Sequence, residues 1–221
     1  MIVDEKRLTY DKKITCLKCK GAFMTKRTLS RNSRVARLDP DGCTYYESTE
    51  MDHMIHEANV CPHCHYTFLD KFVSYKGKNE QFDEMLSMVN PSFTFPRTYR
   101  ESLRIYKLML LFLEFSPQKS GFTVLILQRI AWINRILGNV SEEKRFLKEM
   151  TVKLEQIAKE EGSRSGLSED AIAIRLAEAY ISLDEYEKAR SWFSLLLTNK
   201  GVNEKMREQA RKRWQEFKYD A

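Results

Sequence analysis

Two pairs of cysteines constrain this chain more than any other feature of its sequence. Each pair has a two-residue gap, and the pairs are Cys16 with Cys19 and Cys61 with Cys64. Such a gap lets both thiolates of a pair reach one ion, and Zn²⁺ takes four ligands of this kind tetrahedrally at about 2.3 Å. We therefore predict one structural zinc site held by all four cysteines. Because the segment between the pairs is long, we expect a zinc-ribbon-like region that carries an insertion.

The surroundings of the cysteines favour a metal site over disulfide bonds. Residues 1–7 lack the apolar core of a signal peptide, and the apolar runs are shorter than the roughly 20 residues of a membrane helix. We therefore expect a cytoplasmic protein with no membrane segment, in which thiols stay reduced. The alternative, two unrelated pairs of buried or redox-active thiols, lacks the βαβ pattern that surrounds a redox pair.

Cys43 and the four histidines are the spare metal-ligand types of the chain. His63 lies within the second cysteine pair, where we expect it to be exposed, and His65 follows that pair. Cys43 is more simply explained as a packed side chain than as a catalytic one. A second metal site made of Cys43, His53 and His56 is the alternative that the sequence leaves open.

The charged residues are separated along the N-terminal region. Residues 12–37 contain nine basic residues and no acidic one, and residues 39–57 then contain six acidic residues and no Lys or Arg. Four thiolates around Zn²⁺ carry a net charge of about −2, so the basic run has a simple explanation as counter-charge and solvated surface. The alternative is a phosphate-binding face for nucleic acid. Its candidate residues are Lys26, Arg27, Arg31, Arg34 and Arg37.

From residue 98 onward, apolar residues recur with the period of an α-helix. Ser141 and Ser168 suit helix starts, and glycines suit the stops. A shorter helix is expected at 81–89, and Asn90-Pro91 and Phe95-Pro96 should end it. The predicted helices lie near 98–115, 121–137, 141–161, 168–182, 185–198 and 203–217, with stops at Gly138, Gly162 and Gly201.

The predicted fold is accordingly α+β and mostly α. Residues 1–75 are expected to form a zinc-ribbon-like domain, residues 76–97 a connector with a short helix, and residues 98–221 a tetratricopeptide-like helical domain. In the last helices, Ala177 and Ala189 would let antiparallel helices approach closely, with aromatic residues such as Tyr186 between them. About three helix pairs should then stack into a short superhelix. A plain helical bundle without a groove is the alternative.

The sequence lacks the patterns of familiar zinc and nucleotide enzymes. A zinc deaminase needs His-x-Glu and Pro-Cys-x-x-Cys, whereas here His56 and Glu57 are adjacent and Pro62 follows Cys61. A catalytic zinc also needs an open coordination position, and four thiolates leave none. No Gly-rich phosphate loop, nucleophile elbow or His-Glu-x-x-His motif is present. We therefore expect that the protein is not an enzyme.

The combination of features resembles a bacterial domain-of-unknown-function family with a paired-cysteine N-terminus and a tetratricopeptide-like C-terminus. The resemblance implies zinc at the four cysteines and a helical-repeat C-terminal half, and it implies no activity. One departure is His65, which stands where such turns usually have Gly. The stretches that carry the resemblance are Lys13-Ile-Thr-Cys-Leu-Lys-Cys, Val60-Cys-Pro-His-Cys-His-Tyr, Leu127-Gln-Arg-Ile-Ala-Trp, Glu143-Lys-Arg-Phe-Leu and Met206-Arg-Glu-Gln-Ala-Arg-Lys-Arg-Trp-Gln.

These features favour a protein–protein interaction or adaptor protein with structural zinc. Stacked helix pairs offer a concave face for a peptide or a partner helix. Ile174 and Glu178 do not supply the basic and amide groups with which some tetratricopeptide proteins hold a C-terminal carboxylate, so we do not expect that ligand. The alternative function is a nucleic-acid-binding regulatory protein that uses the basic face. The candidate partner-binding residues are Gln128, Trp132, Arg135, Ile174, Glu178 and Ile181.

Overall fold

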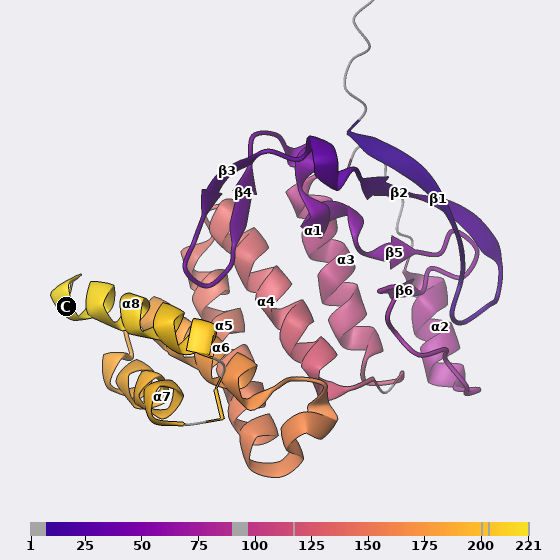
Figure 1. The fold of residues 1–221 in the computed structure, drawn as a ribbon. Helices are drawn as coiled ribbons and strands as arrows, with labels where there is room; N and C mark the ends of the chain where they lie inside the picture. The colour runs from indigo at the N-terminus through magenta and orange to yellow at the C-terminus, as the bar shows by residue number, and fades with distance from the viewer. Residues whose placement is uncertain (1–7, 90–96, 117, 200, 203, 221) are drawn as a thin grey trace, which may run out of the picture. The chain divides into compact units, whose positions relative to one another are not determined.

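The computed structural model describes residues 8–89, 97–116, 118–199, 201–202 and 204–220 (Figure 1). Contacts divide the chain into two compact units. The first unit comprises Met1–Leu38, Thr44–Gln118 and Ile136–Gly138, and the second comprises Asp39–Cys43, Lys119–Arg135 and Asn139–Ala221. By its contacts, the start of the predicted helical domain therefore belongs to the first unit. Whether residues 1–75 and 98–221 fold as separate domains stays a prediction.

Among the described residues of the first unit, the β-structure consists of three separate antiparallel hairpins. In the longest one, Thr9 lies opposite Thr28 and Thr15 opposite Ala22. Its strands are rich in Thr, whose branched side chain favours extended backbone. The pairs are β1 (Thr9–Thr15) with β2 (Ala22–Thr28), β3 (Val35–Leu38) with β4 (Thr44–Tyr46), and β5 (Asn59–Val60) with β6 (Thr67–Phe68).

Three α-helices accompany these hairpins in the described part of the first unit. α1 (His53–His56) contacts β2 and α3, and α3 (Tyr99–Phe112) contacts β6. α2 (Glu80–Met88) is the short helix predicted at 81–89. Thr98 and Glu101 form a reciprocal capping box that begins α3. The break predicted at Asn90-Pro91 and Phe95-Pro96 lies outside the described residues.

Aromatic side chains form the core of the first unit next to the second cysteine pair. The ring of Tyr66 lies 5.9 Å from that of Phe82 and 6.0 Å from that of Phe112, measured between centroids. All three side chains are buried, and the Tyr66 hydroxyl donates to Ser116 Oγ at 3.0 Å. Tyr66 follows Cys64 by two residues, so this core anchors the turn that carries the cysteines.

The second unit is helical. The predicted helices are confirmed to within a few residues, except that the last turn predicted for 141–161 is a π-helical segment, Ile157–Glu161, followed by a 3₁₀ turn. Ser168 caps its helix by accepting from the Ala171 N–H, whereas Ser141 lies one residue inside its helix. The helices are α4 (Ser120–Ile136), α5 (Val140–Gln156), α6 (Glu169–Ser182), α7 (Tyr186–Thr198) and α8 (Glu204–Asp220). The mostly helical α+β fold class is thereby confirmed.

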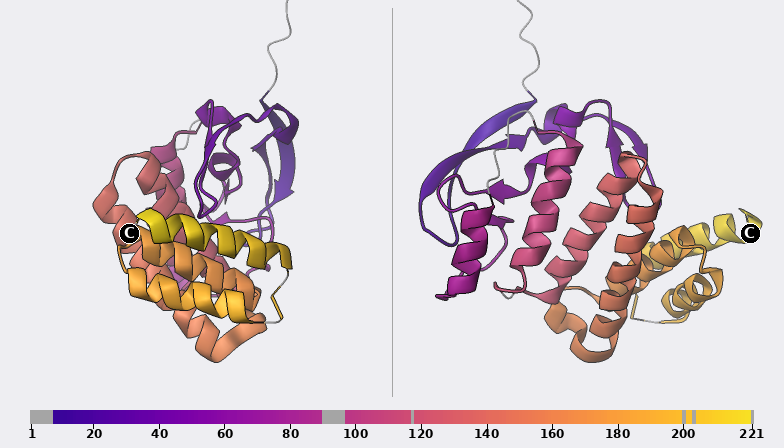
Figure 2. Two further views of the ribbon diagram at one scale, coloured as in Figure 1. Left: turned by 60° about the vertical axis from the view of Figure 1, so that its left-hand side comes forward. Right: turned by 180° about the vertical axis from the view of Figure 1, so that it is seen from behind.

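Small residues hold the last three helices together. α6 packs against α7 and α7 against α8, and Figure 2 shows these helices side by side. Ala173 and Ala177 of α6 share a buried cluster with Phe193 of α7 and Ala210 of α8. The predicted close approach at Ala177 is therefore present. Tyr186, in contrast, is 43% exposed, so it does not fill the space between helices.

No helix within the described ranges is both long enough and apolar enough to cross a membrane.

Candidate metal centre

The first cysteine pair lies in the tight turn between β1 and β2. The Cys16 N–H donates to the Gly21 carbonyl at 2.9 Å, and the Lys20 N–H donates to the Cys16 carbonyl at 3.2 Å. The Lys18 N–H lies 3.4 Å from Cys16 Sγ, which it reaches as a donor. The backbone of the turn therefore faces the Cys16 sulfur with a donor; Cys16 is buried and Cys19 is exposed.

The second pair repeats this arrangement between β5 and β6. The Cys61 N–H donates to the Tyr66 carbonyl at 3.0 Å, and the His65 N–H donates to the Cys61 carbonyl at 2.9 Å. In both turns the residue after the second cysteine is left-handed, with φ of 64° at Lys20 and 60° at His65. Both turns therefore have a non-glycine residue at the left-handed position, as was noted for His65. Each of these two residues is strained by roughly 1 kcal/mol.

Gly21 has a different role from the one its position suggests. It lacks a positive φ, so the tight turn does not require glycine there for its backbone angles. A Cβ atom on Gly21 would instead lie 2.8 Å from His63 Cδ2 and 3.4 Å from Cys19 Sγ. Glycine therefore lets the two turns approach each other around the sulfur atoms.

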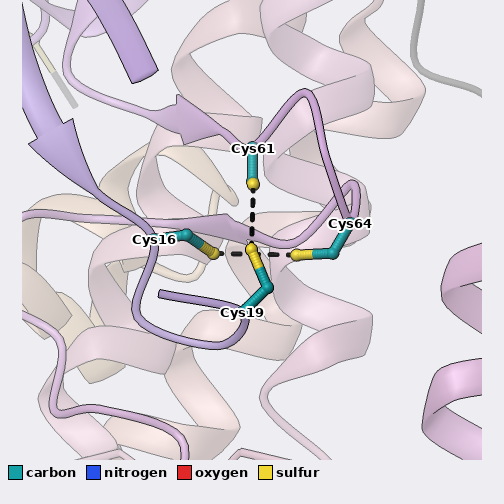
Figure 3. Close-up of side chains that lie close together, drawn as sticks. All are labelled: Cys16, Cys19, Cys61 and Cys64. Carbon is teal, nitrogen blue, oxygen red and sulfur yellow. Dashed lines mark hydrogen bonds between the residues drawn. The ribbon is translucent and has the colours of Figure 1, made fainter. Parts of the chain in front are cut away.

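The four cysteine sulfurs form one compact cluster (Figure 3). All lie within 4.8 Å of one another, and the Cys16–Cys64 and Cys19–Cys61 sulfurs are each 3.6 Å apart. A tetrahedral zinc with Zn–S bonds of about 2.3 Å needs sulfurs about 3.8 Å apart. The cluster therefore fits a metal ion of this kind, and its four ligands would fill the tetrahedron.

The thiols of the cluster differ in their pKa values. A hydrogen bond from the Cys64 thiol lowers the pKa of Cys16 to about 5, and the same bond raises the pKa of Cys64. Burial raises the pKa of Cys61 to about 11. The thiols therefore resist joint deprotonation, because thiolates this close repel one another. A bound dication reverses that balance and lets four thiolates coexist.

A protein-family comparison matches residues 9–217 to the family described as an uncharacterized protein conserved in bacteria, DUF2225. The chain belongs to this family. The match confirms the predicted resemblance, including the cysteine cluster and the helical C-terminal region. No curated protein and no solved structure matches the chain.

Much of the basic run in this DUF2225 member is paired with carboxylates. Lys12 Nζ lies 2.8 Å from Asp70, and Lys26 Nζ lies 2.9 Å from Asp11. Lys18 pairs with Asp83 and lies over the rings of Tyr75 and Phe82. These contacts agree with the simpler explanation of the run as counter-charge and surface.

The five candidate phosphate-binding residues have mixed surroundings. Arg27 donates to the His56 carbonyl at 2.8 Å, to Asn59 at 2.6 Å and to Asp70 at 2.8 Å, so its guanidinium ties β2 to the β5–β6 region. Arg37 stacks on the Tyr45 ring, with 3.8 Å between the guanidinium carbon and the ring centroid. The other candidates are Lys26, paired as above, Arg34, which lies 3.7 Å from Glu47, and Arg31, which is exposed.

The spare ligand types do not form a second metal cluster among the described residues, where the four cysteines are the one such group. Cys43 is fully buried, and His53 Nε2 lies 3.3 Å from Ser33 Oγ. His56 is 2% exposed, and neither of its ring nitrogens has a partner among the described residues. Burial, with the nearby cations Arg97 and Arg27, lowers the pKa of His56 to about 4.

The candidate partner-binding residues lie in the second unit, and most of them meet at two cavities. One cavity, of about 40 Å³, is lined by Gln128, Trp132, Ile174 and Glu178. A larger one, of about 360 Å³, is lined by Arg135 and again by Glu178. Ile181 packs against the α6–α8 core instead.

An acidic turn that the sequence did not link to these residues reaches the same face. Asp41 accepts from Trp132 Nε1 at 2.9 Å, and Arg135 contacts Asp39 at 3.0 Å, Asp41 at 2.9 Å and Glu143 at 2.7 Å. We name residues Asp39–Cys43 the acidic turn. Arg175 lines the smaller cavity and Arg213 the larger one, and neither was a candidate for partner binding. The only sequence signal for Arg175 was its place on the same helix as Ile174 and Glu178.

Proposed function

We propose that this protein is a non-enzymatic adaptor that binds a protein partner on the α4–α6 face of its second unit. The observation that carries the proposal is the acidic turn. Side chains of this face already bind one acidic segment, which is the turn of the chain itself. Trp132 and Arg135 bind the turn through its carboxylates, as a partner's acidic segment would be bound. The cavity of about 360 Å³ beside the turn leaves room for a segment of a partner protein.

The repeat pattern supports the same proposal. Helices that pack in sequence through small residues, as α6, α7 and α8 do, expose a continuous face formed by alternate helices. Gln128 and Trp132 on α4 and Ile174 and Glu178 on α6 line one cavity, as alternate helices of a tetratricopeptide-like stack would. We propose that this stack is the partner-binding part of the protein.

In this proposal the metal is zinc and its role is structural. Four thiolates fill a tetrahedral shell, so no position remains for a water or a substrate. The ion would join the β1–β2 turn to the β5–β6 turn, two segments that are otherwise connected by a long stretch of chain. The four cysteines would hold the ion, and the ion would take no part in a reaction.

A photo-crosslinking experiment with the full chain tests the adaptor proposal. Val140 lines the larger cavity and is 60% exposed, whereas Val152 on the same helix is 68% exposed and lies away from it. A photoreactive phenylalanine at position 140 should crosslink a protein in cells, and the same residue at position 152 should not. The crosslink should survive nuclease treatment.

Two results would count against the proposal. Equal crosslinking from positions 140 and 152 would show that the partner does not bind selectively at the α4–α6 face. Recovery of nucleic acid in place of protein, with binding that weakens steeply as salt rises, would support the alternative function at Lys26, Arg27, Arg31, Arg34 and Arg37. That alternative is less well supported, since Lys26 and Arg27 already contact groups of the first unit.

A further inference from the structure

The smaller cavity of the second unit is lined by two polar side chains, Gln128 and Arg175, that keep free hydrogen-bond donors among the described residues. Gln128 is 5% exposed and lines the cavity, and its side-chain amide has no hydrogen-bond partner among the described residues. An amide that lines a cavity without a protein partner is available to hydrogen-bond a ligand or a water there. The amide of Gln128 can donate two N–H bonds into the cavity.

Arg175 is the second such group. Its guanidinium donates to the Ala171 carbonyl of its own helix at 3.0 Å, and within the described parts of the chain it has no carboxylate partner. Burial lowers the pKa of Arg175, and the neighbouring Arg129 lowers it further. A partly buried guanidinium beside a second cation is stabilised by an anion between them or next to them.

The acidic groups of the cavity do not meet this need. Asp41 is bound by Trp132 and Arg135, and the carboxylate of Glu178 receives Arg213 Nε at 3.0 and 3.2 Å. Asp41 shares Arg135 with Asp39 and Glu143, and Glu178 shares Arg213 with Glu216, so neither acid is paired with Arg175. The positive charge of Arg175 is left for an external group.

We propose that the cavity between Gln128 and Arg175 binds a carboxylate, supplied by an acidic side chain or a chain terminus of an extended partner segment. The inference rests on the proposed function only in taking the carboxylate from a protein partner. The guanidinium offers two parallel N–H donors that match a planar carboxylate, and the Gln128 amide adds a third. Trp132 would cover the ligand's apolar carbons.

The size of the cavity favours a carboxylate over a larger anion. Its volume of about 40 Å³ holds about three waters at roughly 10–15 Å³ for each. A carboxylate group has about that size, whereas a phosphate ester with its four oxygens needs more space. Ile174 and Glu178 supply no basic or amide group, which is why the sequence did not predict a carboxylate ligand; Arg175, next to Ile174, supplies a cation.

The test uses the ¹⁵N-labelled full chain and nuclear magnetic resonance. Sodium acetate is titrated against sodium chloride at constant ionic strength while the side-chain signals of Gln128 and Trp132 are followed. Acetate should give saturable shifts, and Arg175→Met should weaken acetate binding at least tenfold. The control Arg211→Met removes an exposed arginine of α8 and should leave binding unchanged. Gln128→Leu is the second variant if Arg175→Met does not fold.

Two model peptides distinguish the sources of the carboxylate. One carries a central Glu with both ends blocked, and the other carries only alanines with a free C-terminus. Tenfold tighter binding of either one than of a blocked alanine peptide supports the proposal and names the source. Shifts that are linear in acetate, that persist in Arg175→Met, or that are matched by inorganic phosphate would overturn it.

The outcomes separate this inference from the proposed function. Saturable acetate binding without a crosslinked protein at position 140 would keep the pocket and refute the adaptor. A crosslinked partner that binds wild type and Arg175→Met equally, with no acetate response, would keep the adaptor and refute the pocket.

Discussion

The buried imidazole of His56 should make the first unit sensitive to acid. His56 is 2% exposed, and its pKa is lowered from 6.5 to about 4 by burial and by Arg97 and Arg27. Because the folded pKa lies below the unfolded one, protons bind the unfolded state preferentially as the pH falls from about 6.5 to about 4. The stabilisation that depends on a neutral His56 is therefore fully present above about pH 6.5 and is lost as the pH falls from there to about 4.

The size of this loss follows from the two pKa values. Between about pH 7 and about pH 5, the shift from 6.5 to about 4 lowers the free energy of unfolding by about 2 kcal/mol. The variant His56→Leu cannot bind the proton and should lack this loss. Metal release also depends on pH, but it affects both proteins, so the difference between their pH dependences isolates His56.

Hydrogen exchange of the β1–β2 amides measures the opening free energy of the first unit at each pH. We expect the wild type to lose about 2 kcal/mol more than His56→Leu from about pH 7 to about pH 5. The control His63→Gln, which removes an exposed histidine, should behave as the wild type. Equal pH dependence in wild type and His56→Leu, or a His56 ring that titrates near 6.5 by nuclear magnetic resonance, would refute the reasoning.

Three further predictions concern the metal turns and the helical unit. Cys16→Ser should lose the metal and unfold the hairpins while the helical circular dichroism signal of α4–α8 persists, whereas Cys43→Ala should keep the metal; collapse of the whole signal would contradict this. Arg135→Met leaves three carboxylates of 11–18% exposure without their cation and should cost about 3 kcal/mol in urea unfolding; no loss would show that the acidic turn is not held by charge. Phe193→Ala, at a fully buried site, should cost about 3–5 kcal/mol, while Leu195→Ala, half exposed on the same helix, should cost under about 1 kcal/mol.

The helices and the cysteine cluster could be predicted from the sequence because local chemistry specifies them. Apolar residues at helical spacing, together with caps such as Ser168, place α6 to within a residue of its predicted start. The two-residue gap lets both thiolates of a pair reach one ion. The prediction of one cluster then needed only the assumption that the two pairs share the same ion. The hydrophobic pattern also explains why Phe193 and Ala177 are buried together.

The rest depended on contacts between residues far apart in the chain. Arg135 was a candidate for partner binding because of its helix position, yet it binds Asp39, which is 96 residues away. No local pattern signals such a pairing, because the acidic run of residues 39–57 could equally have been expected to pair with the basic run of residues 12–37. For the same reason, the sequence could not show that Arg27 ties strands together or that Arg175 has no carboxylate partner in the described part of the chain.

The two cysteine turns show a second limit of local patterns. Turns of this kind usually have glycine at the left-handed position, and the departure noted at His65 recurs at Lys20. A side chain at Gly21 would meet the ring of His63, which belongs to the other turn, unless that exposed ring moved. A glycine in a sequence can thus serve backbone angles or packing, and only the fold distinguishes the two.

The central claim is that the four cysteines hold one zinc ion with a closed shell of ligands. X-ray absorption at the zinc edge of the protein, purified without added metal, tests it most directly. We predict one zinc per chain with four sulfur ligands at about 2.3 Å and no lighter ligand. A first shell that contains nitrogen or oxygen, or a purified chain that folds fully without zinc, would contradict the account.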